Sequence, residues 1–117
     1  MPVGDDARSL VEQSRRVFDR AVVDCCVRIK EAIGRMLVRD PAYSRVKIWL
    51  KSECFYDERV PTESFQRAVV ERMARDGFRA EPVVRRILGV FGGRVEAYWF
   101  SGWDDPPPSV PEEGPYR

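Results

Sequence analysis

The 117-residue sequence predicts an α+β fold in the order helix, strand, helix, strand, strand, and three observations favour it. Apolar side chains recur at helical spacing through the first third of the chain, whereas residues 44–51 alternate in the manner of a half-buried strand. Two β-rich runs, 83–91 and 94–100, flank Gly92-Gly93, a pair that favours a tight hairpin turn. We expect one domain over residues 1–103, with both helices on one face of a small antiparallel sheet.

The first element is a long amphipathic helix within residues 1–40. Apolar and small residues recur three and four apart from Leu10 to Leu37, and Asp5 and Asp6 suit the N-terminal cap. Asp40-Pro41 ends the helix, because the residue before a proline is pushed out of the helical region. Many of its charged residues lie four apart with opposite sign, which is typical of a solvated face.

This helix is too long for its own domain. About thirty helical residues span about 45 Å, which exceeds the width of a domain of this size. The helix therefore either bends near Gly34 or projects at its N-terminal end and needs a partner. The apolar side chains that a partner would cover are Leu10, Val17 and Phe18.

The second helix has clear end signals. Pro61-Thr62 opens it, and Gly77 is expected to end it in a left-handed conformation, with Phe78 folding back on Met73.

The hairpin register follows from the turn. With a two-residue turn at Gly92-Gly93, Val90 faces Val95 and Val84 faces Ser101. The face expected to meet the helices carries Val46, Ile48, Leu50, Leu88, Val95 and Trp99.

The opposite sheet face is the first candidate binding surface. It is expected to carry Arg45, Lys47, Trp49, Lys51, Arg85, Ile87, Arg94, Tyr98 and Phe100. Basic side chains neutralise phosphates and aromatic rings stack on unpaired bases, so such a face suits single-stranded nucleic acid. Aromatic residues and arginine are equally enriched at protein interfaces, and the long helix could also cover this face.

Charge is divided unevenly along a chain whose formal net charge is +1. Residues 104–117 form a proline-rich tail with four carboxylates and Arg117, which makes the tail −3 and the rest of the chain +4. We expect the tail to be extended or disordered. It contains one Pro-x-x-Pro motif, from Pro108 to Pro111, the kind of sequence that docks in an aromatic groove.

The sequence contains no histidine. This excludes Ser-His-Asp and Cys-His catalytic sites, and it also excludes metal sites with histidine ligands. The cysteines Cys25, Cys26 and Cys54 lack the paired spacing of a zinc site and are expected to be small buried hydrophobes. The acidic residues Glu53, Asp57 and Glu58 match no calcium-loop spacing. We expect no cofactor, no metal and no enzymatic activity.

The sequence also predicts where in the cell the protein is located. The first residues lack a basic and an apolar signal region, and no apolar run approaches about 20 residues, so we expect neither export by a signal peptide nor membrane insertion. The odd number of cysteines favours an intracellular, reducing compartment. No small-molecule substrate is evident.

One stretch resembles a known kind of domain. From Thr62 to Trp99 the sequence reads as a helix closing on Gly77-Phe78, then a strand, a glycine turn and an aromatic strand. This resembles the C-terminal part of small α-β-α-β-β domains that recur in proteins of phages and large DNA viruses. The resemblance implies virion assembly or a structural adaptor, located in the virion if a virus encodes the chain, and it transfers no catalytic residue.

We therefore predict a non-enzymatic protein-interaction or assembly module. It would self-associate or dock on a protein through the long helix and the aromatic sheet face. The alternative is a single-stranded nucleic-acid-binding protein that uses the basic and aromatic sheet face.

Overall fold

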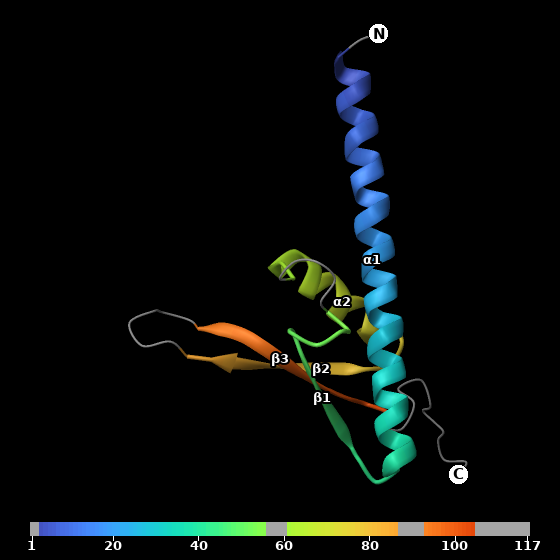
Figure 1. Cartoon of the computed structure of the whole chain (residues 1–117), viewed down its shortest axis with the longest axis vertical. Coiled ribbons are helices and arrows are strands. Elements are labelled where there is room, and N and C mark those ends of the chain that lie inside the picture. Colours follow the sequence, from blue (N-terminus) through green and yellow to red (C-terminus); the bar gives the residue numbers. More distant parts are fainter. Residues whose placement is uncertain (1–2, 56–60, 87–92, 105–117) are drawn as a thin grey trace, which may run out of the picture.

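The computed structural model describes residues 3–55, 61–86 and 93–104. Its elements follow the predicted order, which confirms the α+β prediction (Figure 1). They are α1 (Val3–Arg39), β1 (Arg45–Trp49), α2 (Glu63–Arg75), β2 (Arg79–Arg85) and β3 (Arg94–Ser101). Residues 105–117 of the acidic tail lie outside the described residues. Gly92 of the predicted turn lies outside them too.

Helix α1 is one continuous element of 37 residues that begins earlier than predicted. At 1.5 Å per residue it is about 55 Å long, and only its C-terminal half packs on the rest of the chain (Figure 1). The helix ends just before Pro41, where the Asp40 carboxylate accepts a hydrogen bond from the Ala42 backbone N–H at 3.0 Å. Of the two alternatives, the helix projects instead of bending at Gly34.

Helix α2 has the predicted caps. The Thr62 hydroxyl accepts a hydrogen bond from the Phe65 N–H at 3.2 Å. At the other end Gly77 has φ +92°, and the Phe78 N–H donates to the Met73 carbonyl at 3.0 Å. This six-to-one bond is the Schellman ending that the sequence predicts, and it turns the chain directly into β2.

The three strands form an antiparallel sheet in the order β1-β3-β2. The central strand β3 pairs Phe100 with Val46 and Tyr98 with Ile48. Pro82 lies in the edge strand β2, where a missing backbone donor is tolerated.

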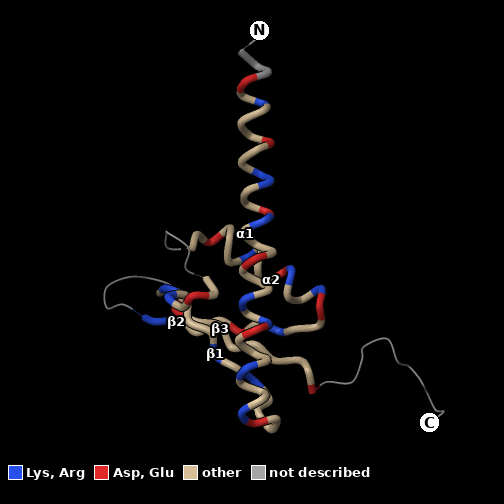
Figure 2. The backbone as a smooth tube through the Cα atoms, turned by 45° about the vertical axis from the view of Figure 1, so that its right-hand side comes forward, with Lys and Arg blue, Asp and Glu red and all other residues tan. Residues whose placement is uncertain are grey.

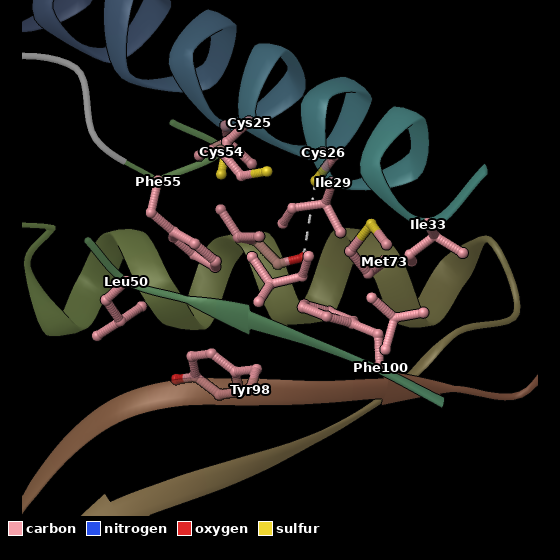
Figure 3. Close-up of a cluster of buried hydrophobic side chains, with 14 residues drawn as sticks. Cys25, Cys26, Ile29, Ile33, Leu50, Cys54, Phe55, Met73, Tyr98 and Phe100 are labelled. Atoms are coloured by element: carbon pink, nitrogen blue, oxygen red, sulfur yellow. Dashed lines mark hydrogen bonds between the residues drawn. The ribbon is translucent and has the colours of Figure 1, made fainter. Parts of the chain in front are cut away.

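The hydrophobic core lies between this sheet and the two helices, which pack on the same sheet face (Figure 3). Phe100, Ile29, Met73 and Val69 are its largest fully buried side chains. The Tyr98 hydroxyl reaches the end of this core and donates a hydrogen bond to the Gln66 side-chain oxygen at 3.0 Å.

The predicted hairpin register was wrong. Ser101 pairs with Arg79 instead of Val84, and a bulge between Val83 and Val84 shifts the remaining pairs. Strand β2 therefore starts at Arg79, earlier than the predicted strand, and its last pair joins Arg85 to Arg94, which leaves residues 86–93 between the strands. A two-residue turn at Gly92-Gly93 would pair Phe91 with Arg94, whereas Arg94 pairs with Arg85. Gly92 itself lies outside the described residues.

The predicted faces of Tyr98, Trp99 and Phe100 in β3 were also wrong, although those of β1 were right. Val46 and Ile48 face the helices as predicted, but Tyr98 and Phe100 lie beside them in the core, and Trp99 lies on the opposite face. Antiparallel partners share a face, so pairing with β1 fixes this assignment. Leu50 is buried, Val95 packs partly against the core, and Leu88 lies outside the described residues.

Candidate interaction surfaces

The first candidate surface is the projecting segment, which we define as residues 6–20 of α1. Every side chain in it is exposed, and Figure 2 shows acidic and basic residues alternating along it. Leu10 is 64% and Val17 70% exposed, and Val11 is similarly open. These apolar side chains do not contribute to the core of their own chain. Their exposure on a projecting helix therefore indicates an interaction surface.

The apolar residues of the projecting segment form one stripe. At 100° per residue its members fall within about 120° of the helix circumference, and no Asp, Glu, Lys or Arg of the segment falls among them. The stripe consists of Ala7, Leu10, Val11, Ser14, Val17 and Phe18.

Phe18 marks the base of the projecting segment. Its ring meets the ring of Phe65 in α2 edge to face, with centroids 5.8 Å apart and planes at 87°. Phe18 remains 37% exposed. Of the three predicted helix-interface residues, Leu10 and Val17 are therefore fully available, whereas Phe18 is shared between the core edge and the stripe.

On the C-terminal side of Phe18, the side of α1 that carries the stripe is buried. Val22, Cys25 and Ile29 enter the core, and an ion pair between Lys30 and Asp76 ties α1 to the end of α2. That Lys30 contact lowers the pKa of the Asp76 carboxyl. The projecting segment is thus anchored at its base by the packing of α1 on α2 and the core.

The three thiols are buried in the core as predicted (Figure 3). Burial raises the pKa of Cys25 to about 12, and it also raises the pKa values of Cys26 and Cys54. The Cys26 thiol donates to the Val69 carbonyl at 3.7 Å, and the Cys54 thiol to the Arg28 carbonyl at 3.6 Å. A thiolate nucleophile needs a lowered pKa, whereas burial raises the pKa values of all three thiols.

The second candidate surface is the open sheet face, the side of the sheet opposite both helices. The strand pairing places on it Arg45, Lys47 and Trp49 of β1, Ala97, Trp99 and Ser101 of β3, and Arg79, Glu81 and Val83 of β2. Beyond the bulge, the pair Arg85 and Arg94 extends it. Its basic residues therefore outnumber its acidic residues.

Cations and aromatic rings alternate across this face. The Arg45 guanidinium lies 4.1 Å from the centroid of the Trp99 ring. The Lys47 ammonium lies 4.2 Å from the Trp49 ring and 5.6 Å from the Trp99 ring. Trp49 is still 46% exposed. The row Arg45, Trp99, Lys47, Trp49 is thus preorganised by cation–π contacts.

The structure brings together only part of the predicted sheet site. The open face carries the predicted residues Arg45, Lys47, Trp49, Arg85 and Arg94, and exposed Lys51 follows β1. Tyr98 and Phe100 belong to the core, and Ile87 lies outside the described residues. Trp99 was missed, because both alternating sets of β3 contain aromatic residues and only the pairing with β1 separates them.

Other chemistry is sparse in the described ranges. They contain no group of three or more His, Cys, Asp or Glu side chains arranged to hold a metal. Glu53 is exposed, and Asp57 and Glu58 lie outside these ranges. A groove between α1 and α2 has mixed charge and is lined by Asp19, Val22, Val23, Ala68, Glu71, Arg72 and Arg75.

No helix in residues 3–55, 61–86 or 93–104 has the length and apolarity to cross a membrane.

Comparison of the chain with protein-family models, with curated proteins and with solved structures finds no match. The two surfaces must therefore be interpreted from their own chemistry.

Proposed function

We propose that this chain is a non-enzymatic assembly module that self-associates through its projecting segment. The observation that carries the proposal is the exposure of Leu10, Val11 and Val17 on a helix that extends beyond its own domain. An exposed apolar stripe adds little to the stability of a single helix in water. Pairing two stripes removes apolar surface from water on both chains, which stabilises the pair. The setting of a virion rests on the sequence resemblance alone and stays a prediction.

A second copy is the favoured partner because the stripe is self-complementary. Its central residues recur at the alternating three and four spacing that lets two helices pack side by side. The rest of the segment carries both charge signs, so no strongly charged partner is selected. Small proteins most often associate as symmetric homo-oligomers, in which one patch serves both copies.

Sedimentation velocity of two matched variants tests this proposal. Leu10→Asp with Val17→Asp places two carboxylates in the stripe and should abolish association. Ser9→Asp with Arg16→Gln makes the same change in net charge on the far side of the helix and should leave association unchanged. Because these side chains are exposed, both variants should unfold like the wild type at low protein concentration, where association does not contribute to stability. Association that survives the stripe variant would contradict the proposal.

The open sheet face favours a second candidate function, binding of single-stranded nucleic acid. Its cations and indole rings alternate, which suits a strand whose phosphates and bases also alternate. Each base stacked on an aromatic ring contributes about 1–3 kcal/mol, so Trp49→Ala should weaken binding about tenfold.

An oligonucleotide titration at low and high salt measures this second candidate function. Lys47→Glu should weaken binding, whereas Arg8→Glu makes the same charge change on the projecting segment and should have a much smaller effect. Affinity should fall steeply as salt rises. Equal loss in the two charge variants, or no binding at low salt, would reject the sheet face as a nucleic-acid site.

A further inference from the structure

We infer that the projecting segment pairs with the same segment of a second copy in antiparallel orientation, with the two-fold axis beside Gln13. This inference rests on the proposed self-association and adds the direction and register of the pair. Three features of the described residues carry it: the sizes of the stripe residues, the chemistry of the stripe's two flanks, and the place where the body of the domain begins.

Residue size favours the antiparallel pair. In heptad terms Ala7 and Ser14 occupy one core position and Leu10 and Val17 the other. In an antiparallel pair, residues of one core position pack against residues of the other core position in the partner. Leu10 therefore packs on the partner's Ser14, and Val17 packs on the partner's Ala7. Each layer then joins a large side chain to a small one, and the layers interdigitate at even spacing.

The parallel alternative packs unevenly. It sets each residue against its own copy, so Leu10 meets Leu10 and Ser14 meets Ser14. Large layers would hold the helices apart where the small layers leave gaps, and gaps lose contacts.

The flanks of the stripe also favour the antiparallel pair. One flank carries Asp6, Gln13 and Arg20, seven residues apart, and the other carries Val11 and Phe18. Antiparallel helices bring like flanks together. Asp6 then lies beside the partner's Arg20, and Gln13 beside the partner's Gln13, while Val11 meets the partner's Val11. A parallel pair would instead press the charged flank against the apolar flank, which desolvates charges without pairing them.

The body of the domain limits how a partner helix can lie. Along α1 the stripe runs directly into the buried positions Val22, Cys25 and Ile29, and Phe65 covers Phe18 at the junction. A parallel partner helix would continue along this side into the space that α2 and the core occupy. In an antiparallel pair Val3, the first residue of the partner's α1, lies beside Ala21, so the described part of the partner helix meets the body only at its end.

Cross-linking with a short bis-maleimide reads out orientation directly. Gln13→Cys should link into covalent dimers, and Asp6→Cys mixed with Arg20→Cys should link to each other. Arg20→Cys alone should not link, because two copies of residue 20 would lie about 20 Å apart along the axis. The wild-type chain, whose thiols are buried, and Ser9→Cys, on the far side of the helix, are the unlinked controls.

Charge reversal gives an independent readout. Asp6→Arg and Arg20→Asp should each raise the dimer dissociation constant about fivefold, since exposed ion pairs are weak but the symmetry repeats the contact. The double variant should restore wild-type affinity, a rescue that the parallel pair does not provide.

The outcomes separate the two claims. Dimers in which Arg20→Cys links as well as Gln13→Cys overturn the antiparallel orientation and leave the proposed self-association standing. Dimers that link at none of these positions, or a chain that stays monomeric at every concentration, overturn both.

Discussion

Phe18 of α1 and Phe65 of α2 meet edge to face at 5.8 Å, and this contact marks where α1 leaves the body of the domain. On the N-terminal side of Phe18 the side chains of residues 6–17 are all exposed, and on its C-terminal side Val22 and Cys25 are buried. One helix thus serves two purposes. Its C-terminal half completes the core, and its N-terminal half presents an apolar stripe.

Phe65→Ala should destabilise the domain by about 1–3 kcal/mol, because it removes an aromatic pair and part of the core edge. Val17→Ala should change the unfolding free energy by less than about 0.5 kcal/mol, since Val17 is 70% exposed. Urea denaturation at low protein concentration measures both variants without a contribution from association. Equal effects would mean that the contact does not fix the base of the projecting segment.

The core should be most sensitive where α2 meets α1 and the sheet. Met73 is fully buried, so Met73→Ala should cost about 2–5 kcal/mol. Val38→Ala is the matched control near the end of α1, where the side chain is 85% exposed and little should change. Thermal unfolding followed by circular dichroism distinguishes the two. A small loss for Met73→Ala would place the core elsewhere.

Glycine substitutions should have opposite effects in the two helices. Gly34 lies inside α1 with open space where an alanine methyl group would lie, so Gly34→Ala should stabilise the domain by about 0.5–1 kcal/mol. Gly77 has open space too but a φ of +92°, so Gly77→Ala should cost about 1–2 kcal/mol. Chemical denaturation of both variants tests this prediction, and a stabilising Gly77→Ala would argue against the left-handed ending of α2.

Alkaline pH should destabilise the domain through Cys25. Its folded pKa of about 12 lies above the ordinary value of 9.0, so its contribution is complete below pH 9 and is lost as pH rises toward 12. Unfolding free energies measured between pH 8 and about 11 should fall less steeply for Cys25→Ala than for wild type. The native thiols should also resist iodoacetamide until the chain is unfolded. Rapid alkylation of the native chain at neutral pH would contradict the buried placement.

Acid should weaken the contact between α1 and the end of α2. The Lys30 hydrogen bond lowers the pKa of Asp76 below its ordinary value of 3.8. Its contribution is therefore present above pH 3.8 and is lost as pH falls through the lower folded pKa. A carboxyl titration of Asp76 by NMR should show a midpoint below 3.8 that moves up in Lys30→Met. An unchanged midpoint in that variant would remove Lys30 as the cause.

The elements with local signals could be predicted from the sequence, and those that depend on pairing could not. Thr62 and Gly77-Phe78 set the ends of α2 by contacts within a few residues, so the prediction of this helix was confirmed. Strand β3 contains Tyr98-Trp99-Phe100, and alternation gives it an aromatic side chain on either face. Pairing with β1, more than forty residues earlier in the chain, decides which of them the core takes.

The candidate sites divide in the same way. Leu10 and Val17 are exposed on the predicted helix, because helical spacing and the length of α1 are local properties of the sequence. In the structure Tyr98 and Phe100 belong to the core instead of the sheet site, and Trp99 belongs to the sheet site instead of the core. The sequence did not predict this because the register of the sheet decides which residues share a face. The bulge beside Val84 depends on the pairing of β2 with β3, which alternation within one strand does not predict.

Sedimentation equilibrium of the full chain over a wide concentration range tests the central claim most directly. If the projecting segment is an assembly surface, the mean mass should rise from 13.5 kDa toward twice that value as concentration increases, and the Leu10→Asp, Val17→Asp variant should stay at 13.5 kDa. A wild-type chain that remains at the monomer mass up to about 1 mM, where even millimolar affinity would be detected, would contradict the claim.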